Sequence, residues 1–247
     1  MTVISRDHGA LPCIAVVVAT TCIGSPALGE TLDDALRALR AGYATLAVEP
    51  LQEAVRILRA RADASDVDGS THYHLARALE GLGLYHVSRG EQDEARRQFE
   101  DGVEAAKIAV ARNPAAAPYH TELGNLYGNL ASQSGIVGKM RNGRLSTAAF
   151  TRALALDPRY ALAHVGMGIA KLETPMAFGG SVAGALAEFR TARTLDPACD
   201  EAWTWEGIAL RRQGAVADAR SALSKALEVN PRSSHARREL IALDEDF

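Results

Sequence analysis

Histidine and cysteine side chains are the groups with which this chain could bind a metal or attack a substrate. The chain has 7 histidines and 3 cysteines among its 247 residues. His72 and His74 would make a metal-binding pair in a strand, but two positions on a helix point about 200° apart. Neither a cysteine nor a carboxylate cluster completes a zinc site at the usual spacing. We therefore expect no metal site and no cofactor.

Sequence motifs for catalysis are also missing. The chain has no Gly-x-Ser-x-Gly elbow and no His-Glu-x-x-His helix. Gly138 and Lys139 resemble part of a phosphate-binding loop, but Gln133 stands where that loop needs glycine, and Met140 where it needs Ser or Thr. Acidic and basic residues mix along 91–107, which is typical of a solvated helix face. We expect a protein that is not an enzyme.

The composition favours a helical protein with a buried core. Lys and Arg total 27 against 30 for Asp and Glu, a formal charge of -3, so a basic nucleic-acid-binding face is not expected. Hydrophobic residues make up 47%, which excludes wholesale disorder. Aromatic residues are only 5%, while Ala and Leu are abundant, and this balance favours helix over sheet.

The first thirty residues have the pattern of a signal peptide. The apolar stretch 11–23 is too short to span a bilayer comfortably, and small residues follow it at Ala27 and Gly29. We predict that residues 1–29 are a signal peptide cut near Ala27 or Gly29, which leaves a periplasmic mature chain without a transmembrane span. An uncleaved N-terminal anchor is the alternative. Cleavage would leave Cys199 as the remaining cysteine, so no internal disulfide could form.

Four Asx-Pro dipeptides divide the rest of the chain into repeats. They are Asn113-Pro114, Asp157-Pro158, Asp196-Pro197 and Asn230-Pro231, each at the end of an Ala/Leu-rich helical pattern, and the last two lie 34 residues apart. Between those two stand Trp203-x2-Glu206-Gly207-x2-Leu210, then Ala219-x3-Leu223 and Ala226. This pattern resembles the tetratricopeptide repeat.

The same pattern of residues recurs at earlier positions of the chain. The resemblance implies an all-α fold, a right-handed α-solenoid of about five helical hairpins plus a C-terminal capping helix, within a domain that covers 30–247. We expect no sheet. The predicted hairpins cover 31–64, 70–114, 115–158, 159–197 and 198–231, with the cap at 232–244.

The second hairpin departs from the 34-residue period. We take Ala76 as its small residue, at the position that Gly124, Gly168 and Gly207 occupy in later repeats. By that alignment each of its helices is seven residues longer than in the last hairpin, about two turns. We expect it to project beyond its neighbours and to carry Tyr85 and His86.

Two further insertions are predicted to be loops. The segment 134–143 contains three glycines, with Lys139 and Arg141 on a solvated basic edge. The segment 173–181 contains Met176 and Phe178, which either tuck back into the stack or contact a partner. Its Pro-x3-Gly-Gly pattern resembles a loop of secreted bacterial tetratricopeptide proteins, some of which are partners of periplasmic transporters.

The resemblance also implies where a partner would bind. Positions one and five residues after the marked small residue line the concave face of such arrays, and Arg211 adjoins one of them. These candidates are Arg77, Asn125, Asn129, Ile169, Glu173, Ile208 and Arg212. Amide and guanidinium groups suit a peptide backbone or a carboxylate, and they loosely resemble a clamp for peptide C-termini. Ordinary polar surface is the alternative.

Three functions fit these observations. The first is a non-enzymatic protein-interaction scaffold or adaptor of the cell envelope with a protein or peptide partner. The second is a periplasmic transport accessory or carrier that binds a hydrophobic small molecule or lipid, which the apolar side chains of Ile169, Ile208, Met176 and Phe178 would contact. The third is a structural role in an envelope complex.

Overall fold

The computed structural model describes residues 30–64 and 66–245, and in these ranges every regular element is helical. The elements are α1 (Leu32–Thr45), α2 (Val48–Ala64), α3 (Ser70–Ser88), α4 (Gln92–Arg112), α5 (Ala117–Ser132), α6 (Ile136–Leu156), α7 (Ala161–Glu173), the 3-10 turn η1 (Met176–Phe178), α8 (Val182–Leu195), α9 (Asp200–Arg212), α10 (Val216–Val229) and α11 (Ser234–Glu245).

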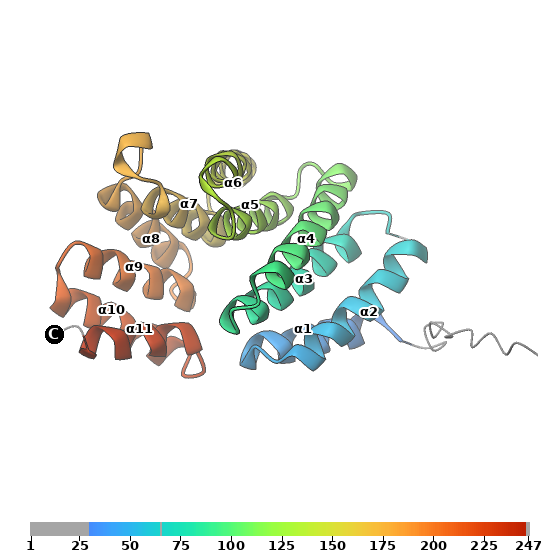
Figure 1. The fold of residues 1–247 in the computed structure, drawn as a ribbon, viewed down its shortest axis with the longest axis horizontal. Helices are drawn as coiled ribbons and strands as arrows, with labels where there is room; N and C mark the ends of the chain where they lie inside the picture. Colours follow the sequence, from blue (N-terminus) through green and yellow to red (C-terminus); the bar gives the residue numbers. More distant parts are fainter. Residues whose placement is uncertain (1–29, 65, 246–247) are drawn as a thin grey trace, which may run out of the picture.

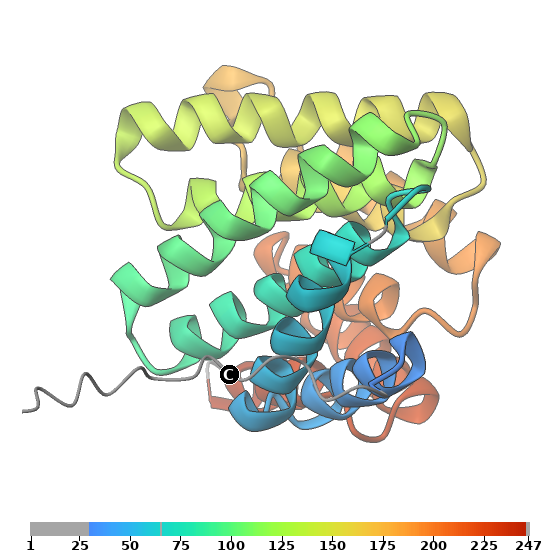
Figure 2. The ribbon, with the colours of Figure 1, turned by 90° about the vertical axis from the view of Figure 1, so that its right-hand side faces the viewer.

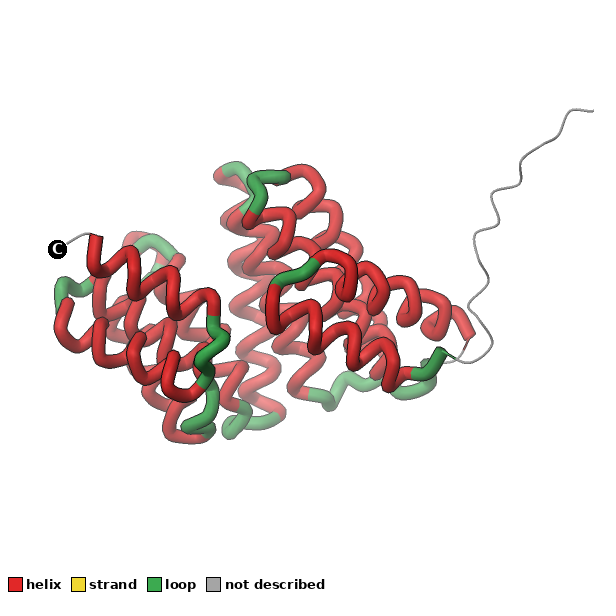
Figure 3. Tube along the Cα trace, turned by 90° about the horizontal axis from the view of Figure 1, so that it is seen from below, coloured by secondary structure: helices red, strands yellow, loops and turns green. Residues whose placement is uncertain are grey.

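Consecutive helices pack in pairs, and the pairs follow one another around an open ring (Figure 1). The first helix of each pair contacts the first helix of the next pair, so α1, α3, α5, α7 and α9 form an inner layer that α11 closes. The second helices lie outside them. Seen from below, the described part is all helix and connecting loop (Figure 3). The predicted all-α array of hairpins with a closing helix is confirmed.

Each Asx-Pro junction is held by the same two hydrogen bonds. The Asp157 side chain accepts from the backbone N–H of Arg159 at 2.9 Å, which is an Asx-turn, and His164 Nε2 donates to the Pro158 carbonyl at 2.9 Å. Trp203 Nε1 donates to the carbonyl of the preceding proline in the same way. His120, His164 and Trp203 therefore tie α5, α7 and α9 to the turn before each helix.

Glycines on first helices let a large side chain of the second helix pack against the backbone. A Cβ on Gly124 would lie 2.6 Å from the Phe150 ring. In the second hairpin the glycine under Phe99 is Gly83, where a Cβ would overlap the ring even more closely. Our placement of Ala76 at this position was therefore wrong. The close approach needs a residue without a side chain, and only Gly83 meets that need there.

With Gly83 at the glycine position, the extra residues of the second hairpin lie at the end opposite to the one predicted. α3 and α4 have 19 and 21 residues against 13 and 14 in α9 and α10, so the predicted lengthening is confirmed. Because Gly83 takes the place of Gly207, the added turns precede it in α3 and lie at the end of α4. Tyr85 and His86 therefore lie beside an ordinary turn, and the prediction that the overhang carries them was wrong.

The predicted loop at 134–143 is also corrected. α6 begins at Ile136 and continues for 21 residues, so most of this insertion is helix. Gln133, Ser134 and Gly135 suffice to make the turn, and the other inserted residues extend α6 backward. α5 has only 16 residues, so the start of α6 projects past it. Figure 2 shows α6 as the long helix along the top of the molecule.

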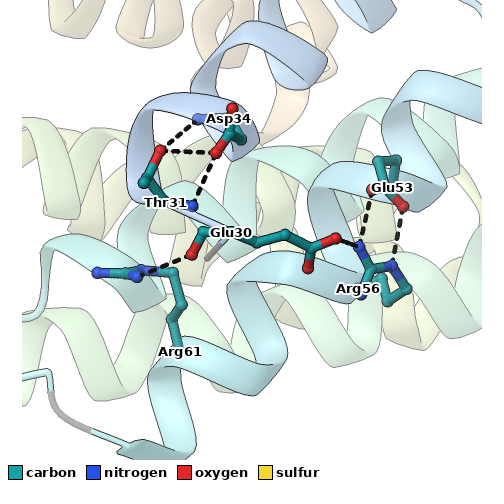
Figure 4. Close-up of polar contacts among 6 residues, drawn as sticks. All are labelled: Glu30, Thr31, Asp34, Glu53, Arg56 and Arg61. Carbon is teal, nitrogen blue, oxygen red and sulfur yellow. Dashed lines mark hydrogen bonds and ion pairs between the residues drawn. The ribbon is translucent and has the colours of Figure 1, made fainter. Parts of the chain in front are cut away.

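The described chain starts with a well-anchored helix cap (Figure 4). Thr31 Oγ1 accepts from the Asp34 backbone N–H at 3.2 Å, and the Asp34 carboxylate accepts from the Thr31 backbone N–H at 2.8 Å. Glu30 forms an ion pair with Arg56, and its carbonyl accepts from Arg61. The predicted signal peptide, 1–29, lies outside the described residues. None of the described helices has the length and apolar character that crossing a bilayer requires.

Candidate functional site: the inner face of the ring

We call the surface formed by the first helices the inner face. Arg77 of α3 lies on it between two aromatic rings: its guanidinium carbon is 5.5 Å from the Tyr43 ring centre and 5.9 Å from that of Tyr73. These distances are typical of cation–π contacts. The side chain is half-buried and forms no ion pair with any residue in the described ranges. Its N–H donors are therefore available to a ligand.

Glu80, one turn after Arg77, joins the first three inner helices. The Tyr43 hydroxyl of α1 lies 3.0 Å from one oxygen of the Glu80 carboxyl and 2.7 Å from the Arg77 carbonyl, and its single proton is shared between these two acceptors. The Asn129 amide of α5 donates to the other oxygen at 3.0 Å. Asn129, a predicted groove residue, thus bridges two helices and holds Glu80 in place.

Glu122 of α5 brings a second, unsatisfied carboxyl to this region. Its side chain is 5% exposed, and Oε1 has no hydrogen-bond partner among the described residues. Burial, followed by the negative charge of Glu80, raises the pKa of the Glu122 carboxyl well above its ordinary value, although Arg77 opposes this shift. An unpaired buried carboxyl oxygen is costly, so Glu122 lowers the stability of this region.

Charged groups on different sides of the ring interact across the inner face. Glu201 at the start of α9 is accessible to solvent, yet it interacts with Glu80 and Arg77 of α3. Enclosure by the surrounding walls, then the charge of Glu80, raises the pKa of the Glu201 carboxyl. One guanidinium thus faces three carboxyls, so the net charge of this cluster is negative whenever two or more of them are ionised.

Asn125 follows Glu122 by three residues and lies on the same face of α5. It is half-buried, and its side chain makes no hydrogen bond to any residue that the structure describes. Arg77 and Asn125 are therefore the partly accessible residues of this cluster whose polar groups have no partner among the described residues.

The remaining predicted groove residues have other roles. Arg211 pairs with Glu239 of α11 at 3.2 Å, and Arg212 pairs with Glu173 of α7 at 2.5 Å, so both arginines join α9 to neighbouring inner helices. Ile169 is half-buried against the C-terminal core.

Ile208 is not on the accessible surface. It is 5% exposed within the same C-terminal core, so its placement as a groove-lining residue was wrong. The corresponding residues of α5 and α7, Asn125 and Ile169, are half-buried.

The loop residues Met176 and Phe178 do not tuck into the stack. They are 85% and 66% exposed, in the turn η1. Of the two alternatives, the buried one is excluded, and contact with a partner stays a prediction.

The described residues hold no group of three His, Cys, Asp or Glu side chains that could bind a metal. Cys199 is buried, and burial raises the pKa of its thiol to about 11. Since the thiolate is the nucleophile, this cysteine is unsuited to covalent catalysis.

Sequence reasoning missed most of the cluster: Tyr43, Tyr73, Glu80, Glu122 and Glu201 were not among the candidates. Helical spacing could have found three of them, because Tyr73 is four residues before the candidate Arg77, Glu80 is three after it, and Glu122 is three before Asn125. Tyr43 lies on α1, which packs against α3, and Glu201 lies on α9, so spacing within one helix could not have found either.

Comparison with known proteins shows the family. The sequence profile of the family described as regulator of microtubule dynamics protein 1-3 matches residues 33–174, more than half of the 247. The chain belongs to this family. A tetratricopeptide-repeat profile matches 178–241, next to the family region. No curated protein sequence matches the chain significantly.

A solved structure with a TM-score above 0.5 supports the same fold for this member of the family. TTC0263, a thermophilic TPR protein in Thermus thermophilus, aligns with a TM-score of 0.64 at 21% identity, over 85% of this chain and 99% of its own. The first TPR of Spaghetti (RPAP3), solved with an HSP90 peptide, aligns with a TM-score of 0.42 at 18% identity, over 53% and 94%. Tetratricopeptide-repeat domains are in general protein-interaction scaffolds, and no catalytic domain is identified in this chain.

Proposed function

We propose that this protein is a non-enzymatic scaffold that holds an extended polypeptide segment against the inner face of its ring. The observation that carries the proposal is that the half-buried side chains of Arg77 and Asn125 have polar groups without partners among the described residues. A peptide backbone alternates N–H donors and C=O acceptors, so one extended segment satisfies a guanidinium and an amide at once.

The charge of the inner face limits which peptide segments bind there favourably. Glu80, Glu122 and Glu201 surround the single guanidinium of Arg77, and burial or enclosure raises the pKa of each of these carboxyls. At a pH where two of them are ionised, a segment with neutral or basic side chains is favoured over one with carboxylates. Of the two ligands that the sequence suggested, the peptide backbone is therefore preferred to a terminal carboxylate.

The test begins with a random peptide library displayed on phage and selected on the purified protein. Calorimetry then measures the affinity of a selected peptide for the wild type, for Asn125→Ala and for Gln52→Ala. Gln52 is an exposed amide on α2, outside the inner layer, and serves as the matched control. Loss of the Asn125 hydrogen bonds should weaken binding by about 1 kcal/mol, roughly fivefold, with an unchanged melting curve.

Equal affinity in all three proteins would mean that the selected peptide binds elsewhere. A tenfold preference for acidic over basic selected sequences would contradict the charge argument but not the scaffold itself.

We further infer a place in the cell envelope, as part of the same proposal. The signal-peptide pattern of 1–29 supports it, and removal of those residues would leave the cap of Thr31 and Asp34 intact. N-terminal sequencing of the protein from cells should begin near residue 28 or 30. A sequence that begins at Met1 contradicts this proposal and leaves peptide binding untouched.

A carrier of hydrophobic molecules is less well supported. Two surface hollows in the described part measure about 280 and 210 Å³, and charged side chains such as Arg59, Asp101 and Glu206 contribute to their walls. Pockets for small molecules usually measure about 300–1,000 Å³, so both hollows lie below that range.

A further inference from the structure

The start of α6 combines exposed apolar side chains with unpaired positive charge. Ile136 and Val137 are each 82% exposed, and Met140 is 50% exposed. These apolar side chains are exposed because the start of α6 projects past the shorter α5, which does not cover them. An apolar surface that no neighbouring helix covers is a candidate docking surface.

Helical spacing places the three apolar residues on one side of α6. At about 100° per residue, Ile136, Met140 and Val137 fall within about 100° of the circumference. The buried residues of α6 are Ser146, Ala149, Phe150 and Ala153, and on the same count they centre about 135° away from the apolar group. The apolar group therefore faces mostly away from the core.

Basic side chains flank this apolar group. Lys139 and Arg141 fall on its two sides, and Arg144 follows one turn after Met140. All three are exposed, and none forms an ion pair with a residue in the described ranges. Lys107 of α4, another cation, interacts with Arg141, while Lys107 itself pairs with Glu104 at 2.7 Å.

The charge of this hairpin differs from that of the whole chain. Between Glu122 and Asp157 the sequence has four basic residues, Lys139, Arg141, Arg144 and Arg152, and no acidic one. The whole chain carries a formal charge of -3. The positive charge is thus concentrated on the hairpin that also exposes the apolar side chains.

We propose that the first turns of α6, residues 136–145, dock the protein on an anionic membrane surface. Apolar side chains flanked by Lys and Arg are the pattern of a helix that lies in the interface, with its cations near lipid phosphates. An acidic polypeptide would engage the cations but would leave Ile136 and Val137 in water, so the lipid surface is favoured. The proposal is independent of peptide binding to the inner face.

The experiment is cosedimentation with vesicles of phosphatidylglycerol and, separately, of phosphatidylcholine. The wild type should bind the anionic vesicles at least about tenfold more tightly, and 1 M salt should reduce that binding. Arg141→Glu should weaken it by about tenfold. Arg152→Glu, the same reversal about 16 Å along α6, is the matched control and should have a much smaller effect.

A second variant separates the apolar contribution from charge. Ile136→Ser/Val137→Ser keeps the net charge, should fold normally because both residues are exposed, and should weaken binding by about tenfold. Every variant carries the same N-terminal residues, so these cannot cause a difference.

Three results overturn the proposal. The first is an equal loss in Arg141→Glu and Arg152→Glu, which would indicate only a general charge effect. The second is binding to polyglutamate but not to phosphatidylglycerol vesicles, which would indicate an acidic protein partner. The third is a dimer in sedimentation that Ile136→Ser/Val137→Ser dissociates, because a second copy would then cover this surface.

Discussion

At the scale of residues, the inner face combines fixed and unused polar groups. Glu80 has both carboxylate oxygens bonded, to Tyr43 and Asn129, and this fixes its position. Glu122 Oε1 has no partner among the described residues, and Arg77 contacts the rings of Tyr43 and Tyr73. Burying unsatisfied groups opposes folding, so their retention is best understood through binding.

The raised pKa of Glu122 makes a testable contribution to stability. The carboxyl binds a proton more tightly in the folded than in the unfolded protein, so its contribution is full below its ordinary value of 4.5 and is lost as pH rises through the folded pKa. Glu122→Gln should therefore raise the free energy of unfolding at pH 7.5 relative to wild type, by on the order of 1 kcal/mol. The advantage should shrink at pH 5.

Urea denaturation at the two pH values measures this difference. Glu100→Gln, at an exposed carboxyl of α4, is the control and should change stability little at either pH. A Glu122→Gln variant that is less stable than wild type at pH 7.5 would show that the ionised carboxylate is satisfied in solution.

Cys199 gives a second prediction at this scale. Because it is buried and its pKa is raised to about 11, its thiol should react slowly with a thiolate-directed reagent at pH 7.5. Mass spectrometry of the peptide that contains Cys199 should show at least about tenfold faster labelling in denaturant. Equal rates in the two conditions would mean that the start of α9 opens freely.

At the scale of elements, a glycine facing a Phe or Leu side chain sets the spacing within each hairpin. Gly124→Ala would place a Cβ 2.6 Å from the Phe150 ring, so we expect a loss of about 1–3 kcal/mol from overpacking. Gly143 of α6 has open space at the corresponding position, and Gly143→Ala should stabilise the helix by about 0.5–1 kcal/mol. Thermal unfolding of the two variants checks the opposite signs, and two losses of similar size would contradict this packing argument.

Hairpin positions were predictable because prolines mark the junctions. Asn or Asp before Pro makes an Asx-turn, and the residue six positions after each proline bonds back to its carbonyl. The location of extra residues within a hairpin was not predictable from spacing. The same seven-residue excess can extend either end, and the contact of Gly83 with Phe99 decides which. Glycines at 138 and 143 favoured a loop, but packing of the rest of α6 outweighs their weak helix propensity.

At the scale of the molecule, α11 closes the array, because an uncovered last hairpin would expose its apolar face. Leu243 of α11 is 0% exposed, whereas Ile241, two residues before it, is 52% exposed. Leu243→Ala should cost about 2–5 kcal/mol and lower Tm by roughly 5–15 °C. Ile241→Ala is the matched control on the same helix and should change Tm by less than about 2 °C. Similar effects of the two changes would indicate that α11 is not docked in solution.

The central claim is that the inner face of the ring holds a peptide, and photocrosslinking tests the location of that peptide directly. A photoreactive benzoylphenylalanine replaces Tyr160, whose ring interacts with Arg77 and Glu122, or replaces Gln52 on α2. On irradiation with a selected peptide, the Tyr160 variant should form the crosslinked product and the Gln52 variant should not. Crosslinking from Gln52 with none from Tyr160, at peptide concentrations that saturate both proteins, would contradict the account.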